Sequence, residues 1–97
     1  MDSDCGHCWN DAAKMSENHA VYGTNGAVVF ITVSVGMLAS EHSRAETVAF
    51  QEKGDFVGCY ESVAPNCNDR PGEPHDWIYV DDLNQDAFQD YKLRGVP

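Results

Sequence analysis

The chain has 97 residues, and 42% of them are hydrophobic. This is enough for one domain with a compact core. Sixteen acidic residues against six basic ones give a net charge of −10. Such a charge repels nucleic acid and anionic membranes and attracts basic surfaces, although many small proteins are acidic only for solubility. We therefore expect direct binding neither to nucleic acid nor to a membrane.

Residues 9–20 are predicted to form the first helix. Trp9, Ala12 and Ala13 fall near one face of it, and polar side chains fall on the other. The helix is expected to end at residues 22–26, which contain two glycines and an asparagine.

The apolar run of residues 27–35 is predicted to be the central strand of a sheet, because it is rich in β-branched residues. From Ile31 onward apolar and polar residues alternate, which is the period of a strand. Residues 28–31 are apolar on both faces, so this end should be covered on both sides. Replacing a buried Ile31 with Ala should then cost roughly 2–5 kcal/mol.

A β-hairpin is predicted next. Residues 36–44 are ambiguous between a short helix capped by Ser40 and the end of a strand followed by a loop, and we favour a loop that joins antiparallel strands. Residues 47–51 alternate as a strand does, residues 52–55 contain Gly54 and favour a turn, and residues 56–63 are read as the return strand.

The last third of the chain begins with an irregular loop, since residues 64–74 contain three prolines. Residues 76–80 are predicted to be a short strand and residues 82–93 the last helix. Asp82 and Gln85 match a capping box at its start. The order of helix, four strands and helix predicts a small α+β fold. It would be a single acidic domain, residues 1–97, with an antiparallel sheet of three to four strands and a helix at each end.

The segment Cys5–Gly–His–Cys8 resembles the redox dithiol of protein disulfide isomerases. That motif follows a buried strand in a βαβ unit, whereas only four residues precede it here. A pKa of Cys5 lowered by the following helix would be the physical basis of a thiol function. The simpler interpretation is that Cys5 and Cys8 pack beside Trp9.

A structural zinc site is the second interpretation of the cysteines. Cys5 and Cys8 would supply one half of a tetrahedral site, and the other half would come from Cys59, Cys67 or His75. The second half lacks a tight knuckle, because seven residues separate each of its members from the next. We therefore predict a reduced protein with no metal and no other cofactor.

Catalytic motifs are missing from the sequence: it has no glycine-rich phosphate loop, nucleophile elbow or zinc-protease motif. We therefore do not expect an enzyme. The N-terminus is acidic and polar, unlike a secretion signal. No apolar run reaches the roughly 20 residues of a spanning helix. A cytoplasmic protein is expected.

Acidic residues concentrate near the C-terminal end. Six of them and no Lys or Arg lie within residues 71–91, and aromatic residues are interleaved with them. Aromatic side chains beside polar ones are typical anchors of protein interfaces. The residues predicted to contact a basic partner are Asp76, Asp81, Asp82, Asp86, Asp90 and Tyr91.

These features predict a non-enzymatic acidic protein that binds a basic protein surface. Its most specific form is an inhibitor that imitates nucleic-acid phosphates, as phage anti-defence or anti-CRISPR proteins do. One alternative is a small zinc- or thiol-dependent protein that uses Cys5 and Cys8. Another is an interaction subunit, such as an immunity protein to a basic toxin.

Overall fold

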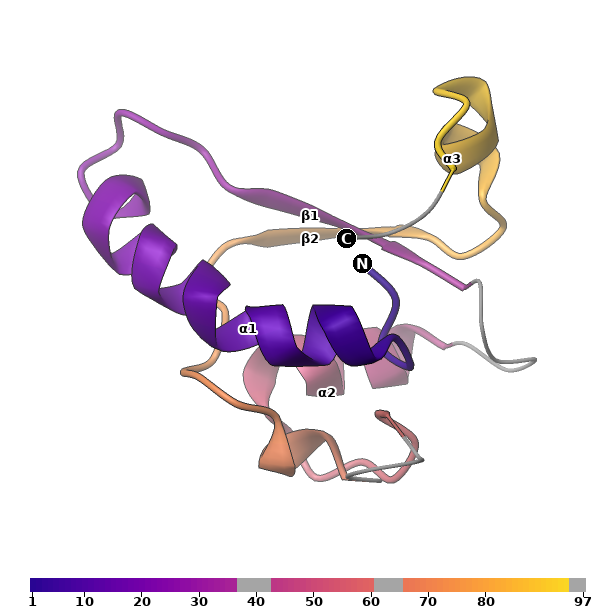
Figure 1. The fold of residues 1–97 in the computed structure, drawn as a ribbon, viewed down its shortest axis with the longest axis horizontal. Coiled ribbons are helices and arrows are strands. Elements are labelled where there is room, and N and C mark those ends of the chain that lie inside the picture. The colour runs from indigo at the N-terminus through magenta and orange to yellow at the C-terminus, as the bar shows by residue number, and fades with distance from the viewer. Residues whose placement is uncertain (37–42, 61–65, 95–97) are drawn as a thin grey trace.

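The computed structural model describes residues 1–36, 43–60 and 66–94. Three α-helices and two strands alternate along the chain (Figure 1), with a π-helical turn after the first helix and a 3-10 turn before the second strand. Their bounds are Gly6–Asn18 for α1, His19–Gly23 for the π-helical turn, Ile31–Val35 for β1, Arg44–Glu52 for α2, Cys67–Asp69 for the 3-10 turn, Ile78–Asp82 for β2 and Asp86–Asp90 for α3.

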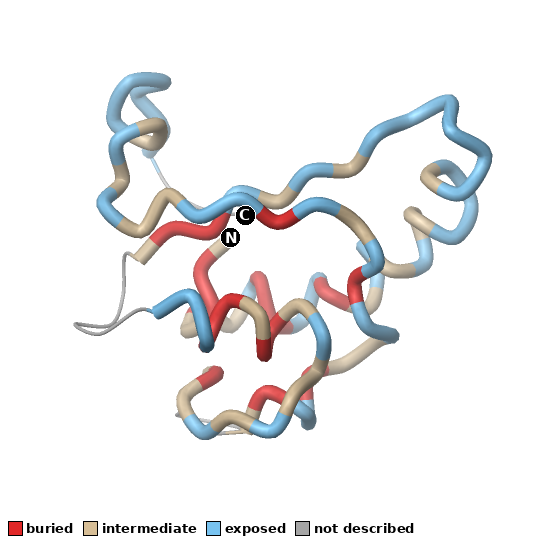
Figure 2. The backbone as a smooth tube through the Cα atoms, turned by 180° about the vertical axis from the view of Figure 1, so that it is seen from behind, coloured by how far each residue is buried: buried red, intermediate tan, exposed pale blue. Residues whose placement is uncertain are grey.

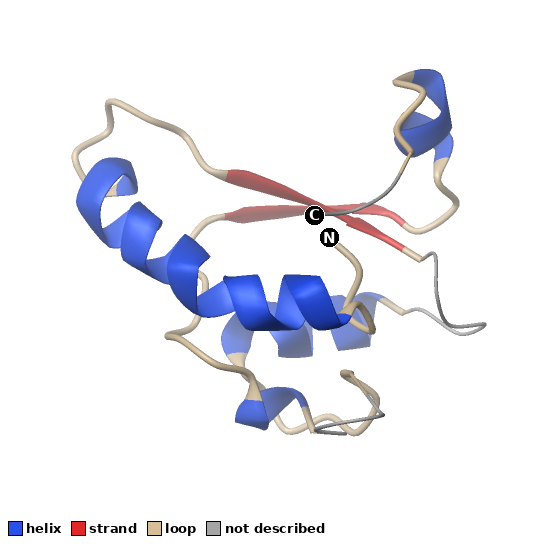
Figure 3. Cartoon of the chain, viewed as in Figure 1, coloured by secondary structure: helices blue, strands red, loops and turns tan. Residues whose placement is uncertain are grey.

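The sheet consists of β1 and β2, and the two strands are parallel. Ile31 pairs with Ile78, and the register continues to Val35 and Asp82. The prediction of an antiparallel sheet of three to four strands is therefore wrong, although the α+β class is right. Parallel strands need a long crossover between them. Here that crossover contains α2 (Figure 3).

The predicted strand at residues 47–51 is in fact the body of α2. The Ser43 side chain caps this helix by accepting a hydrogen bond from the Glu46 amide at 3.1 Å. Thr47 and Phe50 are buried three residues apart, which is a helical spacing. Because residues 47–51 are helical, the predicted β-hairpin of residues 47–63 is wrong. Of the predicted joining loop 36–44, residues 37–42 lie outside the described residues, and Arg44 already belongs to α2.

The return strand predicted at residues 56–63 is also wrong where the structure describes it. Val57 forms only an isolated antiparallel bridge with Asn66, and residues 61–65 lie outside the described residues. Cys59 is fully buried and forms a disulfide with Cys67. This bond contradicts the prediction that all cysteines are reduced, and it ties residues 53–60 to the 3-10 turn.

The run 27–35 is not an inner strand. Only its second half pairs, and Ile31 is 59% exposed. Residues 27–29 are exposed loop residues, so burial on both faces is wrong, and so is the predicted cost of replacing Ile31. The reason is that α1 and α2 lie on one side of the two strands (Figure 1), so the other face is left uncovered by them.

The core lies between the helices and the inner side of the strands (Figure 2). Trp9 and Ala12 of α1 meet Phe50 of α2 and Tyr79 of β2 there. The rings of Trp9 and Phe50 pack edge to face at 6.4 Å. A hydrogen bond of 3.1 Å between the Ser34 and Thr47 hydroxyls joins β1 to α2, so the polar inner positions of β1 are also buried.

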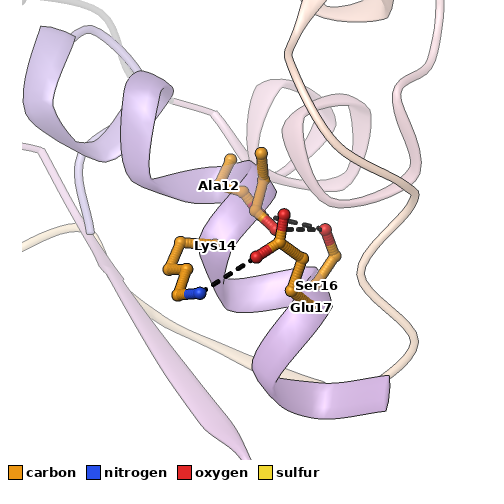
Figure 4. A network of polar contacts seen from close by, with 5 residues as sticks. Ala12, Lys14, Ser16 and Glu17 are labelled. Carbon is orange, nitrogen blue, oxygen red and sulfur yellow. Dashed lines mark hydrogen bonds and ion pairs between the residues drawn. The ribbon is translucent and has the colours of Figure 1, made fainter. Parts of the chain in front are cut away.

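The helix predicted at residues 9–20 is confirmed as α1, which begins three residues earlier and continues into the π-helical turn. The Ser16 hydroxyl donates to the Ala12 carbonyl at 3.3 Å and to the Ala13 carbonyl at 2.8 Å (Figure 4). It also accepts from the Glu73 amide at 3.3 Å. On the outer side an ion pair of 3.0 Å joins Lys14 and Glu17 (Figure 4).

The strand predicted at residues 76–80 is confirmed as β2, shifted by two residues. The last helix is one turn, Asp86–Asp90, and not the predicted residues 82–93. The capping box is wrong because Gln85 is the N-cap, with a left-handed φ of 61°. Within the described part of the chain, no helix has the length and apolar character needed to span a membrane.

Candidate functional site

The acidic residues predicted to bind a partner lie on β2, α3 and the segments beside them. Asp76, Asp86 and Asp90 are exposed, and the salt bridges between described residues do not involve them. Asp86 and Asp90 begin and end the single turn of α3. Their spacing of four residues places them on one face, about 6 Å apart along the axis.

Two other members of the predicted set already have structural partners. Asp81 accepts a hydrogen bond from Arg44 at 2.9 Å, which links β2 to the start of α2. The carboxylate of Asp82 accepts from the amides of Ala87 at 3.1 Å and Phe88 at 2.8 Å. Asp82 therefore satisfies the first amides of α3. The structure thus leaves Asp76, Asp86 and Asp90 as the acids of this set best placed to meet a partner.

Exposed apolar side chains lie on the two strands of the sheet. Ile31 and Val33 of β1 pair in register with Ile78 and Val80 of β2, and each of the four is at least 40% exposed. They point to the face of the sheet that faces away from α2, because side chains alternate along a strand. We call these four residues the apolar strip. Parallel strands are normally covered on both faces, and exposed apolar patches of this kind are typical of interaction surfaces.

The aromatic residues interleaved with the acids differ in their exposure. Tyr91, which follows α3, is 79% exposed. Tyr79 is buried in the core, and the Trp77 ring stacks on His75 with centroids 4.1 Å apart. Phe88 of α3 is half-buried. Of the aromatic residues interleaved with the acids, Tyr91 is thus the exposed one, and its role as an anchor stays a prediction.

The cysteines form two separate pairs. The disulfide removes Cys59 and Cys67 from the predicted set of zinc ligands. Cys5 and Cys8 remain thiols, and both are buried at the start of α1. Among the described residues no group of three or more His, Cys, Asp or Glu side chains is placed to hold a metal ion. The set Cys5, Cys8, Cys59, Cys67 and His75 is thus not brought together.

Burial raises the pKa of the Cys8 thiol to about 11, and the neighbouring Cys5 thiol adds to this effect. The amide of Asp2 donates to the Cys8 sulfur at 3.5 Å and acts in the opposite direction. The thiol is therefore protonated at neutral pH. Because the thiolate is the form that attacks disulfides and binds metals, Cys8 is poorly suited to the redox role that its motif suggests.

A polar network that the sequence did not reveal lies at the centre of the core. Arg70 is fully buried, and its guanidinium donates to four backbone carbonyls. These belong to Phe50 at 2.7 Å, Pro71 at 2.8 Å, Glu73 at 2.9 Å and Gln51 at 3.4 Å. Burial lowers the pKa of Arg70. The carbonyl dipoles nevertheless surround a group that stays charged in proteins.

His75 connects this arginine to α1 and β2. Its Nε2 lies 2.9 Å from the Ala12 carbonyl and 3.1 Å from Arg70 Nη1, and its Nδ1 lies 2.6 Å from the Tyr79 hydroxyl. A carbonyl can only accept, so Nε2 carries the proton and Nδ1 accepts from Tyr79. Burial, together with a smaller effect of the Arg70 charge, lowers the pKa of His75 to about 4.

Next to this network lies a pocket of about 270 Å³ between α1 and β1. One wall is the face of α1 that carries Cys8, Asp11 and Met15, and the other is β1 from Ile31 to Val33. The floor is aromatic. The complete lining consists of Met1, Cys8, Asp11, Ala12, Met15, Ile31, Thr32, Val33, Phe50, His75, Trp77 and Tyr79.

Three buried groups of the pocket, His75, Cys8 and Tyr79, are held in their neutral forms at pH 7. His75 is neutral and Cys8 is protonated. Burial raises the pKa of Tyr79 to about 12, so that hydroxyl is protonated as well. A general acid or base works best with a pKa near the working pH, and these three groups lie far from it. The pocket is chemically suited to packing an apolar group.

Sequence reasoning had no means of finding Arg70 or the pocket. Arg70 stands in a proline-rich loop without periodicity, and a charged residue is expected to be exposed there. His75 was considered only as a metal ligand. The pocket joins residues that are up to 78 positions apart, Met1 to Tyr79. Comparisons of this chain with protein-family models, with curated proteins and with solved structures give no match, so its function is argued from these residues alone.

Proposed function

We propose that this protein is a non-enzymatic binding protein that covers a basic surface of another protein. The contact surface consists of the apolar strip together with Asp76, Asp86, Asp90 and Tyr91. One observation carries the proposal: four exposed aliphatic side chains are paired in register on β1 and β2, and exposed carboxylates lie just before β2 and on α3, in a chain of net charge −10.

The two parts of this surface have different roles. The apolar strip supplies contact area, since burying apolar surface drives association. The carboxylates select a basic partner and speed the encounter. Asp81 and Asp82 support the surface through Arg44 and the α3 amides and contribute less charge to it. A partner with an apolar patch bordered by Lys and Arg would match both parts.

The most specific form of the proposal is an inhibitor that occupies a nucleic-acid-binding surface, of the phage anti-defence or anti-CRISPR kind. Asp86 and Asp90 would then take the place of backbone phosphates. The apolar strip has no counterpart in a phosphate backbone. It supports an interaction subunit, such as an immunity protein, equally well. Competition with nucleic acid separates the two forms.

The cellular location of the protein is also part of what we propose. The sequence predicts a cytoplasmic location. Disulfides are rare in a reducing cytoplasm, so the bond between Cys59 and Cys67 favours an oxidising compartment. Counting free thiols in protein isolated from its native source decides the matter, since two of the four should react after unfolding if the bond is present.

The experiment is a capture from a bacterial lysate at low and high salt, followed by affinity measurements with the protein captured. Asp86→Lys with Asp90→Lys should leave the protein folded and weaken binding at least tenfold. The wild-type affinity should fall steeply with salt, because screening weakens exposed charge interactions. Double-stranded DNA should displace the wild type from the captured protein if the inhibitor form is correct.

The matched control is Glu52→Lys with Asp69→Lys, which changes the net charge equally at exposed positions on α2 and the 3-10 turn. It should lower the affinity much less than the α3 pair. Ile78→Ser with Val80→Ser should weaken binding with little effect on its salt dependence. Equal loss in both charge variants would mean that the acidity acts only through the net charge, and the proposed surface would then be wrong.

A further inference from the structure

The edge of β1 that faces away from β2 is paired by one described residue. The Met1 amino group donates to the Val33 carbonyl at 2.7 Å, and the Met1 carbonyl accepts from the Val35 amide at 2.8 Å. These two bonds make Met1 the partner of Ser34 in the pattern of a parallel strand. One end of this edge therefore already forms backbone hydrogen bonds in the pattern of a paired strand.

The same edge is open further along β1. Because the backbone groups of a strand point alternately to its two sides, the N–H and C=O of Ile31 and the N–H of Val33 face the same way as the groups that bind Met1. No described residue hydrogen-bonds to these three groups. Unpaired edge groups are a template for an added strand.

The pocket lies directly beside this open edge, since Ile31, Thr32 and Val33 form one of its walls. The facing wall is one side of α1, where Cys8, Asp11, Ala12 and Met15 follow helical spacing. A groove between a strand edge and a helix suits an extended peptide: backbone bonds form along the strand, and alternate side chains enter the groove. At about 270 Å³, the pocket is smaller than most sites for drug-sized ligands. It suits a single large side chain.

The charge of the groove decides which occupant fits. Asp11 is exposed on the helical wall. The positive Met1 amino group lies at one end of the same edge, where it is bonded to the Val33 carbonyl, and the chain as a whole carries −10. A second copy of this chain would bring the same negative charge to the contact and be repelled. A peptide segment with Lys or Arg would be attracted, and it would place its basic side chain near Asp11.

We propose that the groove between α1 and β1 binds an extended basic segment of another protein as an added strand on the β1 edge, with one aromatic or large aliphatic side chain in the pocket. This groove uses the backbone edge of β1 opposite to β2 and the facing side of α1, whereas the contact surface proposed above uses outward side chains of both strands and the acids near β2 and α3. Ile31 and Val33 belong to both. The substitutions that test the groove, at Asp11 and Met15, differ from those that test the contact surface, at Ile78, Val80, Asp86 and Asp90, so either proposal can fail without the other.

The test uses capped synthetic pentapeptides with the full chain. The first has a central phenylalanine, a valine on each side and a lysine at each end. The second replaces the lysines with glutamates. The third is the lysine peptide with a methyl group on the backbone nitrogen of the phenylalanine, which removes one hydrogen-bond donor and retains every side chain.

Amide hydrogen exchange, followed residue by residue by NMR, reports the binding. The lysine peptide at saturation should slow exchange at Ile31 and Val33 at least tenfold, because their amides face the open edge. The Thr32 amide faces β2 and should change less than twofold, which makes it an internal control. The glutamate peptide and the methylated peptide should each bind at least tenfold more weakly.

Two protein variants test the groove from its helical side. Asp11→Asn should reduce the preference for lysine over glutamate peptides, and Asp69→Asn, at an exposed position outside the groove, should not. Met15→Trp should obstruct the pocket and weaken binding at least tenfold. Val57→Trp, at a site that is 73% exposed, is the matched control and should bind as the wild type does.

Three results would overturn the proposal. The first is unchanged exchange at Ile31 and Val33 with the lysine peptide at millimolar concentration. The second is equal binding of the methylated peptide, which would mean that side chains alone are recognised. The third is protection of both amides that rises with protein concentration without peptide, because a second copy would then occupy the edge.

Discussion

At the scale of single residues, the core is organised around a charge. Arg70 is a buried cation that donates hydrogen bonds to four backbone carbonyls, and its Nη1 also lies 3.1 Å from His75 Nε2. Its guanidinium also lies 5.1 Å from the centre of the Phe50 ring, within the range of a cation–π contact. A single side chain thereby ties the end of α2 to the loop before β2. The neutral state of His75 is part of this arrangement, because a protonated ring would meet the guanidinium at 3.1 Å.

His75 should make the folding stability depend on pH. Its pKa is lowered from 6.5 to about 4 in the folded protein. Between these values the unfolded chain binds more protons than the folded one, so the free energy of unfolding falls as the pH drops from about 6.5 to 4. The loss should reach up to about 3 kcal/mol. Urea unfolding at a series of pH values measures it.

The matched variants for this test are His75→Gln and His7→Gln, since His7 is exposed. His75→Gln will be less stable at neutral pH but should show a much smaller decline over this window, leaving the contribution of the carboxylates. His7→Gln should follow the wild type. If the free energy of unfolding fell equally steeply in all three proteins, protonation of His75 would not destabilise the fold, and its pKa would not be lowered by folding.

At the scale of elements, the two strands and α2 form a βαβ unit with helices on one side only. The burial of the strands is therefore uneven: Tyr79 and Ser34 lie in the core, while Ile31 and Ile78 face outward. The longest apolar run of the sequence thus contributes little to the core through Ile31. Helix α2 contributes more, because Phe50 contacts Trp9 and the Arg70 and His75 side chains.

Two alanine substitutions should separate these roles. Phe50→Ala removes a ring that is 1% exposed and should cost about 3–5 kcal/mol of the free energy of unfolding. Ile31→Ala, at a site that is 59% exposed, should cost less than about 1 kcal/mol. Urea denaturation of both variants measures the difference. Costs of similar size would show that Ile31 is buried in solution, by a partner copy or by another part of the chain.

At the scale of the whole molecule, the disulfide restrains a segment without helix or strand. The bond joins residues eight positions apart and fixes residues 53–60 against the 3-10 turn. Closing a loop of this size should stabilise the folded chain by about 2–3 kcal/mol in the chain-entropy model. A small domain with a two-stranded sheet depends on such a restraint more than a larger one does.

Reduction should therefore lower the melting temperature of the wild type, measured by circular dichroism with and without a phosphine reductant. Cys59→Ala with Cys67→Ala should melt at a lower temperature than the oxidised wild type and should not respond to the reductant. Cys5→Ser with Cys8→Ser should respond as the wild type does, because these thiols are not bonded. An unchanged melting temperature of the wild type after addition of the reductant would contradict a stabilising disulfide.

The sequence by itself determined the α+β class, the helix α1, the strand β2 and the location of the second half of the apolar run in a strand. Each of these has a local cause: a helical face in α1, and β-branched residues in the strands. The sequence also shows that acidic residues concentrate in residues 71–91, because the charge of a segment can be counted from its residues alone. These acids are part of the proposed binding surface, and their role stays a prediction.

Only the tertiary structure decided the direction of the sheet and the positions of the buried polar groups. Residues 47–51 alternate over five positions, which is too short to tell a strand from one side of a helix. Reading them as a strand removed the crossover helix, and without a crossover the sheet had to be antiparallel. The Arg70 network and the pocket join distant parts of the chain through packing and burial. No local pattern encodes such contacts, because the stability of each group depends on neighbours that only the folded chain supplies.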